Sequence, residues 1–455
     1  MSTANAPAKR RKFFASHNLW FVFWTAFLVR VAYITFAHTY RIRLLQDHFQ
    51  FGWEMGRVAR ALATGYGYAD PFVGHTGPTA WVPPVYPLLL AAVFKLFGVY
   101  TAKSAWIILT INSVFSAATA PLIYKIAARC YNRRVAVWSA WLWALYPAFM
   151  QYAVHWVWEM ALTAFLFTGV LLLALKMRGI LPREPEREPG PVRGDPGIGK
   201  PNPEEVHQTT AQWLLFAALW GLVALCNPSL LLFLPASGIW ILLAAHPLSA
   251  GLKNATLAAL LFLAILAPWT IRNWRVFHTV IPVRDNLGAE LESDSGPGSN
   301  GLPVMATLPL VARAKQTILY KSLGEIRYVQ LEGNQAKAYI AAHPAHYALI
   351  SLKRFYFFWV SVPHPVDRHP FNEFFRELDY CFLSITGILG LALSLKNRTP
   401  AAGLFLCAFL LLPLTYYFVT ANARFRHPLE PLIAIFTVYL FQSTAPRRSK
   451  YREGS

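Results

Sequence analysis

The stretch LWFVFWTAFLVRVAYITFAH (residues 19–38) is the first run of this chain that is long and apolar enough to cross a bilayer. It is too long for the core of a signal peptide and lacks a small-residue cleavage site, so we expect an uncleaved first span. The stretch QDHFQFGWEMGRVARALATGYGYADPF (46–72) comes soon after it, and its first part, residues 47–60, carries the charged residues Asp47, Glu54, Arg57 and Arg60. Two acids and two arginines just outside a span indicate either a site or the membrane interface.

The composition places the whole chain among polytopic membrane proteins. Of its 455 residues, 55% are hydrophobic and 14% are charged, whereas soluble domains carry about 25% charged residues. The formal net charge of +20 indicates loops at an anionic leaflet and an anionic substrate rather than a nucleic acid. The four cysteines are far apart and lie in or beside apolar runs, so we expect buried small side chains rather than metal ligands.

Ten apolar runs are near the length of about 20 residues that a bilayer requires. They are 19–38, 104–128, 135–153, 157–176, 212–227, 229–246, 254–272, 377–395, 400–420 and 428–443. The run 85–98 is shorter and contains Lys95, so we expect a helix that lies at the interface or re-enters the membrane. The predicted fold class is an all-α polytopic membrane protein with about ten transmembrane helices.

The basic residues orient these spans. With the N-terminus inside, the basic clusters fall on the cytoplasmic side: KRRK (9–12), RCYNRR (129–134), KMRG (176–179), Lys253, SLKNR (394–398) and PRRSKYR (446–452). Both ends are then inside, and two long segments, 39–103 and 273–376, are outside. In the second segment we expect helices near 307–322 and 328–355.

Three parts follow from this topology. The N-terminal membrane half (1–180) contains the first outer segment and its candidate catalytic acids. The stretch 181–211 is rich in Pro, Gly and charge, which predicts a disordered cytoplasmic linker. The C-terminal membrane half (212–455) contains the second outer segment. Two long loops over a helix bundle can enclose a site, so we expect one between them.

The first candidate acids lie directly beyond the first span. If 45–63 is a helix, Asp47, Phe51 and Glu54 share one of its faces, and the glycines at 65 and 67 end it. The Asp47 carboxylate would then face the enclosed cavity. The alternative is that Asp47 only marks the membrane interface.

A second acid lies at the outer end of the fourth span. His155 and Glu159 are spaced i, i+4 in AVHWVWEMALTAF, and a wholly apolar run follows Glu159. An ionisable residue at the lip of a span is costly, which favours a functional role. The alternative is a Glu159 that a neighbouring His or Arg neutralises.

Two arginine clusters face the same side of the membrane. APWTIRNWRVF (267–277) contains Arg272 and Arg275, and NARFRHPLEP (422–431) contains Arg424, Arg426 and His427. The second cluster is in a short outer loop, against the usual charge bias, so something must compensate for it. An anionic ligand is one compensator, because guanidinium groups bind phosphate with paired hydrogen bonds. Pairing with Glu430 or with the acids above is the other.

In the order of these motifs, the chain resembles the GT-C type glycosyltransferases, in the family of protein O-mannosyltransferases and lipid A aminoarabinose transferases. The resemblance covers nearly the whole chain. It rests on the acid after the first span, GYGYADPF leading to WVPPVYPLLLAAVFKLFG (81–98), the acid of the fourth span, PWTIRNW and RFRHPLEP. No single motif is specific, but their order and topology together are.

The resemblance implies transfer of a sugar from a polyprenyl-phosphate carrier to an acceptor on the outer face, with inversion at the anomeric carbon. It implies Asp47 as the base and Glu159 as a second acidic site residue, and Glu54 is our candidate to replace the acid that many relatives carry directly after the first. The resemblance implies that Arg272, Arg424 and Arg426 hold the lipid phosphate or shape its pocket. The other candidate substrate-binding residues, which the resemblance does not supply, are Arg57, Tyr86, His155, Arg275 and His427. The implied partners are the lipid donor and membrane lipids, with the acceptor undefined.

The chain also departs from the family pattern. Many relatives carry a second acid directly after the first, where this chain has His48, and a basic residue before the paired prolines, where it has Val82. The phosphate must then be bound by other residues, or the donor headgroup differs. Asp47, Glu159 and His155 offer ligands for Mg or Mn, although their spacing does not require a metal.

Two other functions remain open from the sequence. A transporter or flippase would share the spans, but the chain has no internal repeat and its charges cluster at one surface, whereas transporters place them near the bilayer midplane. A ligase or polymerase that joins glycan chains would use a similar outer cavity. Short loops and the lack of a retention signal favour a bacterial inner membrane, with the site on the periplasmic side.

Overall fold

The computed structural model describes residues 19–42, 50–182, 208–304, 307–310, 314–362 and 370–444. Helices dominate these residues, and no strand longer than the single bridge between Ala69 and Pro78 occurs among them. The all-α fold class is therefore confirmed. Asp47 and most of the predicted linker lie outside the described residues.

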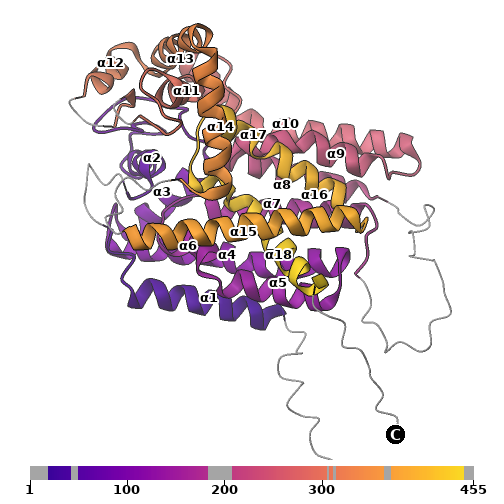
Figure 1. The fold of residues 1–455 in the computed structure, drawn as a ribbon. Coiled ribbons are helices and arrows are strands. Elements are labelled where there is room, and N and C mark those ends of the chain that lie inside the picture. Colours follow the sequence, from indigo (N-terminus) through magenta and orange to yellow (C-terminus); the bar gives the residue numbers. More distant parts are fainter. Residues whose placement is uncertain are drawn as a thin grey trace, which may run out of the picture.

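A bundle of apolar helices makes up most of the molecule (Figure 1). Its helices are α1 (Leu19–Phe36), α4 (Ala102–Cys130), α5 (Arg133–Leu145), α6 (Pro147–Val154), α7 (Met160–Met177), α8 (Thr210–Cys226), α9 (Leu234–Leu242), α10 (Leu248–Phe277), α15 (Pro370–Lys396), α16 (Ala402–Leu411), α17 (Leu414–Phe418) and α18 (Glu430–Thr444). Two short 3₁₀ helices, η2 (Pro228–Phe233) and η4 (Ala423–Leu429), connect parts of the bundle.

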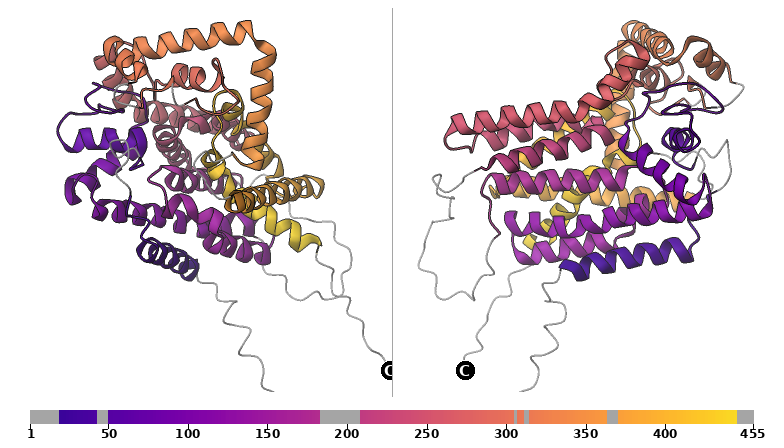
Figure 2. Two further views of the ribbon diagram at one scale, coloured as in Figure 1. Left: turned by 60° about the vertical axis from the view of Figure 1, so that its left-hand side comes forward. Right: turned by 180° about the vertical axis from the view of Figure 1, so that it is seen from behind.

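The remaining helices gather at one end of this bundle (Figure 2). They are α2 (Trp53–Ala63), α3 (Val85–Phe97), α11 (Leu287–Ser295), α12 (Lys315–Leu323), α13 (Glu325–Ala342) and α14 (Pro344–Val360). All six come from the segments 39–103 and 273–376, so the two long predicted loops lie at the same end. We call this end the outer unit.

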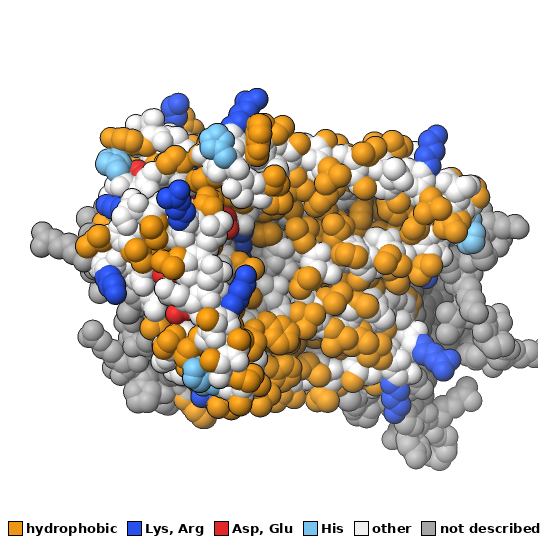
Figure 3. All heavy atoms as spheres, turned by 90° about the horizontal axis from the view of Figure 1, so that it is seen from above, with side chains coloured by type: hydrophobic (Ala, Val, Ile, Leu, Met, Phe, Trp, Pro, Cys, Tyr) orange, Lys and Arg blue, Asp and Glu red, His pale blue; other side chains and the backbone are white. Residues whose placement is uncertain are grey.

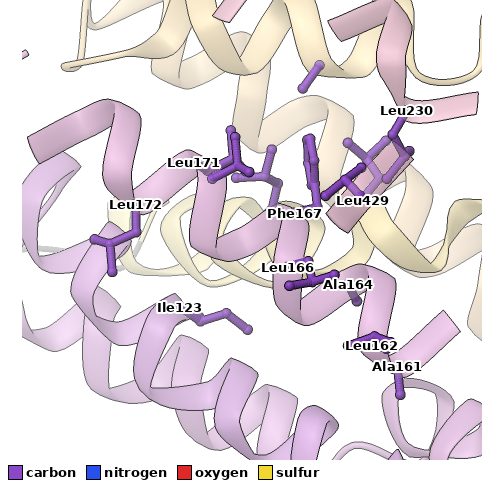
Figure 4. Close-up of a cluster of buried hydrophobic side chains, with 14 of the residues drawn as sticks. Ile123, Ala161, Leu162, Ala164, Leu166, Phe167, Leu171, Leu172, Leu230 and Leu429 are labelled. Atoms are coloured by element: carbon purple, nitrogen blue, oxygen red, sulfur yellow. The ribbon is translucent and has the colours of Figure 1, made fainter. Parts of the chain in front are cut away.

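Helix α7 lies at the centre of the bundle. Most of its residues are buried, and Leu166, Phe167 and Leu171 belong to the large apolar cluster that also holds Ile123 of α4 and Leu429 of η4 (Figure 4). Close packing of this kind holds helices together in a bilayer, where the lipid is as apolar as the side chains. The centre of the bundle thus fixes the positions of the helix ends from which the site is built.

Five helices among the described residues are both long and apolar enough to cross a membrane. They are Leu19–Phe36, Ala102–Cys130, Met160–Met177, Leu248–Phe277 and Phe374–Lys396. Shorter apolar helices occupy Val85–Phe97, Thr210–Cys226, Pro228–Leu242 and Ala402–Phe418. Every predicted span coincides with helix, but the number of ten spans stays a prediction.

Several predicted helices are interrupted. The predicted span 135–153 is divided into α5 and α6, because Tyr146 is extended and Pro147 has no N–H to continue the helix. The predicted helix 328–355 is likewise divided at His343, before Pro344. Proline therefore sets both boundaries.

The surface of the protein also differs between the bundle and the outer unit. Figure 3 shows acidic side chains at one end of the visible face, with histidines and several of the basic side chains, and apolar side chains over much of the rest. Large exposed apolar residues such as Trp20, Leu260 and Ile385 lie on the long bundle helices. This pattern is typical of helices that face lipid beside an end that faces water.

Candidate functional site

The helix expected at 45–63 begins later than predicted. Gly52 has φ 103° and Trp53 has φ 50°, both in the left-handed region, and α2 begins at Trp53. Phe51 therefore precedes the helix, where it packs on Phe94 and Tyr100, so the prediction that Phe51 and Glu54 share a helical face was wrong. The predicted end is confirmed, since α2 ends at Ala63, just before Gly65 with φ 91°.

The two outer segments pack on each other through an apolar cluster. Val58, Phe72 and Trp81 of the first segment lie in it with Tyr320 and Tyr328 of the second. Phe72 and Tyr320 are in edge contact, with ring centroids 5.0 Å apart. The outer unit is therefore one packed body built from both loops.

Polar contacts reinforce this packing. The Glu325 carboxylate of α13 accepts hydrogen bonds from the Thr79 hydroxyl, the Ala80 N–H and the Tyr320 hydroxyl. Burial raises the pKa of Glu325 to about 7. This carboxyl joins the first outer segment to the second just before the paired prolines at 83 and 84.

Arg272 of α10 contacts the same part of the first outer segment from the bundle. Its guanidinium donates to the carbonyl oxygens of Thr79 and Tyr68, at 2.6 and 2.7 Å, and lies over the ring of Trp269. This predicted phosphate ligand thus holds the backbone of the first outer segment. Arg275, one turn later on α10, is exposed.

A charged cluster lies where the outer unit meets the bundle. Glu159, directly before α7, is 7% exposed, and the charges of Arg424, Arg284 and Glu54 all act on it. Arg284 pairs with Glu290 of α11, with 3.7 Å between Nη2 and Oε2. The structure therefore brings together two acids that were predicted, Glu54 and Glu159, although they are far apart in the sequence.

Glu54 has a distinctive environment in this cluster. Burial raises its pKa, the positive charges of Arg57 and Arg424 lower it, and Glu290 raises it further. Burial is the largest of these effects. A carboxyl group whose pKa is raised towards neutrality is suited to exchange a proton.

Arg424 is held at the centre of the cluster by η4. Asn422 caps the start of this turn, because its side-chain oxygen accepts a hydrogen bond from the Arg424 N–H at 3.2 Å. The guanidinium lies over the Trp158 ring, 4.4 Å from its centroid. Cation–π contact of this kind fixes a guanidinium without neutralising it. Arg424 therefore stays available as a positive charge.

Arg426 and His427 have different surroundings from Arg424. Both are fully buried and pair with Glu430, with 3.4 Å from Arg426 Nη2 to Oε1 and 2.6 Å from His427 Nδ1 to Oε2. Arg426 also donates to the Tyr380 carbonyl at 2.9 Å. The pairing with Glu430 is the alternative raised for these residues from the sequence, and their role in substrate binding stays a prediction.

Tyr86 and His155 have different hydrogen-bond partners. The Tyr86 hydroxyl and the Asn112 amide are hydrogen-bonded at 3.0 Å, and Tyr86 is near enough to Glu159 to feel its charge. His155 follows the end of α6 and contacts the Tyr33 hydroxyl of α1 at 3.1 Å. Since α7 begins at Met160, His155 and Glu159 do not lie on one helix, and the expected i, i+4 pair is wrong.

A metal site gains no support from the described residues. No group of three or more His, Cys, Asp or Glu side chains suited to a metal occurs among them. Glu159 lies among arginines while His155 contacts Tyr33, so the two described members of the proposed set do not fit a shared ion. No chemistry is assigned to a metal here.

Three site residues were missed from the sequence. Arg284 and Glu290 join the cluster from the second outer segment, and Tyr416 lies beside Arg284 and Glu159 from α17. Arg284 could have been predicted from the sequence, because a basic residue on the outer side of a span is unusual. No sequence pattern pointed to Glu290 or Tyr416.

Comparison with known proteins was informative over part of the chain. Residues 81–178 match the sequence model of the family described as dolichyl-phosphate-mannose-protein mannosyltransferase. This segment begins at Trp81, contains Tyr86 and Glu159, and ends just after α7. No curated protein matched the chain.

Solved structures resemble the chain at low identity. The apo oligosaccharyltransferase of Archaeoglobus fulgidus has a TM-score of 0.49 at 15% identity, over 95% of this chain and 51% of that chain. The same organism's AglB, in complex with an inhibitory peptide and a dolichol-phosphate, has a TM-score of 0.46 at 14% identity, over 95% and 51%. ArnT from Cupriavidus metallidurans bound to undecaprenyl phosphate has a TM-score of 0.36 at 13% identity, over 94% and 78%.

The chain spans about half the length of the oligosaccharyltransferase chains that it matches. Over residues 81–178 it is similar to the dolichyl-phosphate-mannose-protein mannosyltransferases, which confirms the resemblance to a GT-C type glycosyltransferase that its sequence predicted.

Proposed function

We propose that this protein transfers a sugar from a polyprenyl-phosphate carrier to an acceptor hydroxyl at the outer face of a membrane. The observation that carries the proposal is the meeting of two guanidinium groups, Arg284 and Arg424, with the carboxyl groups of Glu54 and Glu159. This cluster lies at the outer end of an apolar bundle. A phosphate on a lipid tail needs both a positive charge and an apolar surface beside it.

In the proposed reaction, carboxylates handle the proton and arginines stabilise the leaving phosphate. The acceptor oxygen attacks the anomeric carbon opposite the phosphate, and the bond from that carbon to the phosphate oxygen breaks, so the configuration inverts. The acceptor proton passes to a carboxylate, for which we propose Asp47. The carrier leaves as polyprenyl phosphate, and Arg424 and Arg284 stabilise the charge that develops on it.

Glu54 and Glu159 have supporting parts in this proposal. Each is near Arg424, so each carboxylate helps to fix the guanidinium, and their negative charges keep the phosphate from being bound too tightly. Because burial raises the pKa of Glu54, this group takes up a proton more readily than an exposed glutamate does. The acceptor approaches from the side of the outer unit.

The test is sugar transfer by purified protein in vesicles, with polyprenyl-phosphate mannose, glucose and galactose as donors and membrane extract as acceptor. We expect transfer from at least one donor. Asp47→Asn should lower the rate by about a hundredfold or more, because it removes the base. Arg424→Gln should lower it through lost stabilisation of the leaving phosphate, by about a hundredfold.

The matched control is Lys337→Gln, which removes an exposed charge from α13 far from the cluster in sequence. Its rate should equal that of the wild type. Equal rates for Asp47→Asn and wild type would remove Asp47 from the mechanism. Absence of transfer from all three donors, in a correctly folded protein that also fails to bind polyprenyl phosphate, would contradict the proposed function and favour a transporter.

A further inference from the structure

Three tryptophans lie against the charged cluster. Trp53 starts α2, and Trp156 and Trp158 lie in the turn between α6 and α7. The Trp156 and Trp158 rings are stacked with centroids 4.9 Å apart and 12° between their planes. Trp53 lies 4.4 Å from Trp158 and 5.7 Å from Trp156. We call these three residues the tryptophan wall.

The backbone that positions the tryptophan wall adopts an unfavourable conformation at one residue. Trp53 has φ 50°, a conformation that is unfavourable for a bulky side chain and that tends to occur at functional sites. On the other side, the Asn112 amide donates to the carbonyl oxygens of Trp156 and Trp158, at 3.4 and 3.5 Å. The same Asn112 is bonded to Tyr86. Asn112 of α4 therefore helps to position the half of the wall that carries Trp156 and Trp158.

The wall also presents an unused donor. Trp158 is 8% exposed, and its indole N–H has no hydrogen-bond partner among the residues that the structure describes. A buried N–H without an acceptor is costly, and tryptophan usually finds one when it is buried. The N–H of Trp158 therefore indicates that an acceptor atom from a ligand belongs beside it.

Membrane-interface tryptophans do not account for this arrangement. Such residues are exposed on the outside of a membrane protein, and Trp20, Trp138 and Trp274 are exposed in this way, by 67%, 56% and 54%. Trp158 is buried, and Trp53 and Trp156 are half-buried and packed on it. The Arg424 guanidinium covers part of the Trp158 ring.

We infer that the tryptophan wall binds the sugar ring of the lipid-linked donor, an inference that rests on the proposed function. One face of a pyranose carries C–H groups, which pack well on the electron-rich face of an aromatic ring. Trp53 and Trp156 offer their half-buried faces, and the Trp158 N–H donates to a sugar hydroxyl oxygen. Arg424 lies next to the wall, so the phosphate follows the sugar directly.

The experiment compares two lipids that differ in the sugar alone. Undecaprenyl phosphate and undecaprenyl-phosphate mannose, glucose and galactose are titrated against purified protein, and the dissociation constants are measured by microscale thermophoresis. We expect the wild type to bind at least one of the sugar-bearing lipids more tightly than it binds undecaprenyl phosphate. Trp156→Ala should weaken that binding about tenfold and leave undecaprenyl phosphate unchanged within about twofold.

Two further variants separate the contributions. Trp158→Phe keeps an aromatic ring but removes the N–H, and should weaken sugar-bearing lipid by about three- to tenfold. Trp138→Ala removes an exposed tryptophan of the bundle and should change neither constant. Because Trp158→Phe is conservative, it tests the inference even if Trp156→Ala fails to fold.

The outcomes distinguish this inference from the function it rests on. If Trp156→Ala and Trp158→Phe bind sugar-bearing lipid as the wild type does, the wall is not the sugar site, and the proposed function still stands. If the wild type binds neither kind of lipid, the proposed function fails and the inference fails with it.

Discussion

At the scale of single residues, Glu325 predicts how stability depends on pH. Its carboxyl group is buried at the junction of the two outer segments, and its pKa is raised to about 7. In the unfolded chain a glutamate titrates near pH 4.3. Between these two values the folded state binds the proton more strongly, so stability falls as the pH rises from about 4.3 to 7 and is level above that range.

The variant Glu325→Gln should flatten part of this slope. Melting temperatures in detergent, measured from pH 5 to pH 8, should fall less with pH than in the wild type. The slope should persist in part, because burial also raises the pKa of Asp294 and of Glu332 to about 7.

The control for this prediction is Glu377→Gln, which changes a partly exposed acid on α15. Its melting temperature should follow the wild-type curve at every pH. A slope in Glu325→Gln that equals the wild-type slope would show that Glu325 is ionised in the folded protein throughout this range.

At the scale of elements, the crossing of α11 and α13 depends on two glycines. A Cβ added at Gly288 would lie 2.2 Å from the Val329 carbonyl oxygen and 3.1 Å from the Gly333 Cα. Both are backbone atoms, so no side-chain movement can relieve the contact. Helix α11 also carries Glu290 and directly follows Arg284, so this crossing sets the position of two cluster charges.

Gly288→Ala should therefore lower the unfolding free energy by about 1–3 kcal/mol and reduce transfer activity. The matched variant is Gly169→Ala in α7, where no heavy atom lies within 4 Å of the added Cβ apart from the chain neighbours and the backbone of the helix itself. There the change should be neutral, or stabilising by about 0.5–1 kcal/mol, because alanine favours helix. Thermal unfolding and transfer rates measured together would check both. Equal losses in the two variants would contradict the packing argument.

Elements were predictable where length and apolarity decide them. The runs 104–128 and 254–272 became α4 and α10 because nothing in them interrupts a helix strongly enough to end it, even with Pro121 and Pro268 inside. The start of α2 was not predictable, because it depends on the left-handed backbone at Trp53. Trp53 packs on Trp158, which lies far away in the sequence, so the surroundings of this residue could not be read from its own stretch of the chain.

At the scale of the whole molecule, the site combines residues from four distant parts of the chain. Glu54, Glu159 and Arg424 were readable because each is a charge beside an apolar run. Glu290 was not readable, because its place beside Glu54 follows from the packing of α11 on α13 and of the second outer segment on the first. Sequence patterns therefore predicted the ends of the bundle but not the residues that the outer unit brings to them.

Topology gives the prediction that tests the whole arrangement. Basic residues such as Arg133, Arg134 and Arg178 lie where α5 starts and α7 ends, while Glu54 and Glu325 lie in the outer unit. The first group should face the cytoplasm and the second the opposite side. In a variant without the four native cysteines, single cysteines at Tyr66 and Leu181, which are 59% and 76% exposed, report on the two sides.

A membrane-impermeant maleimide applied to intact cells should label Tyr66→Cys and not Leu181→Cys. Permeabilised cells should show labelling of both, because both side chains are exposed and only the bilayer separates them from the reagent. Ala26→Cys, at a fully buried position in α1, should stay unlabelled in both conditions. Labelling of Leu181→Cys alone in intact cells would invert the molecule, which would place Glu54, Glu159 and Arg424 on the cytoplasmic side and require a carrier lipid whose sugar faces the cytoplasm.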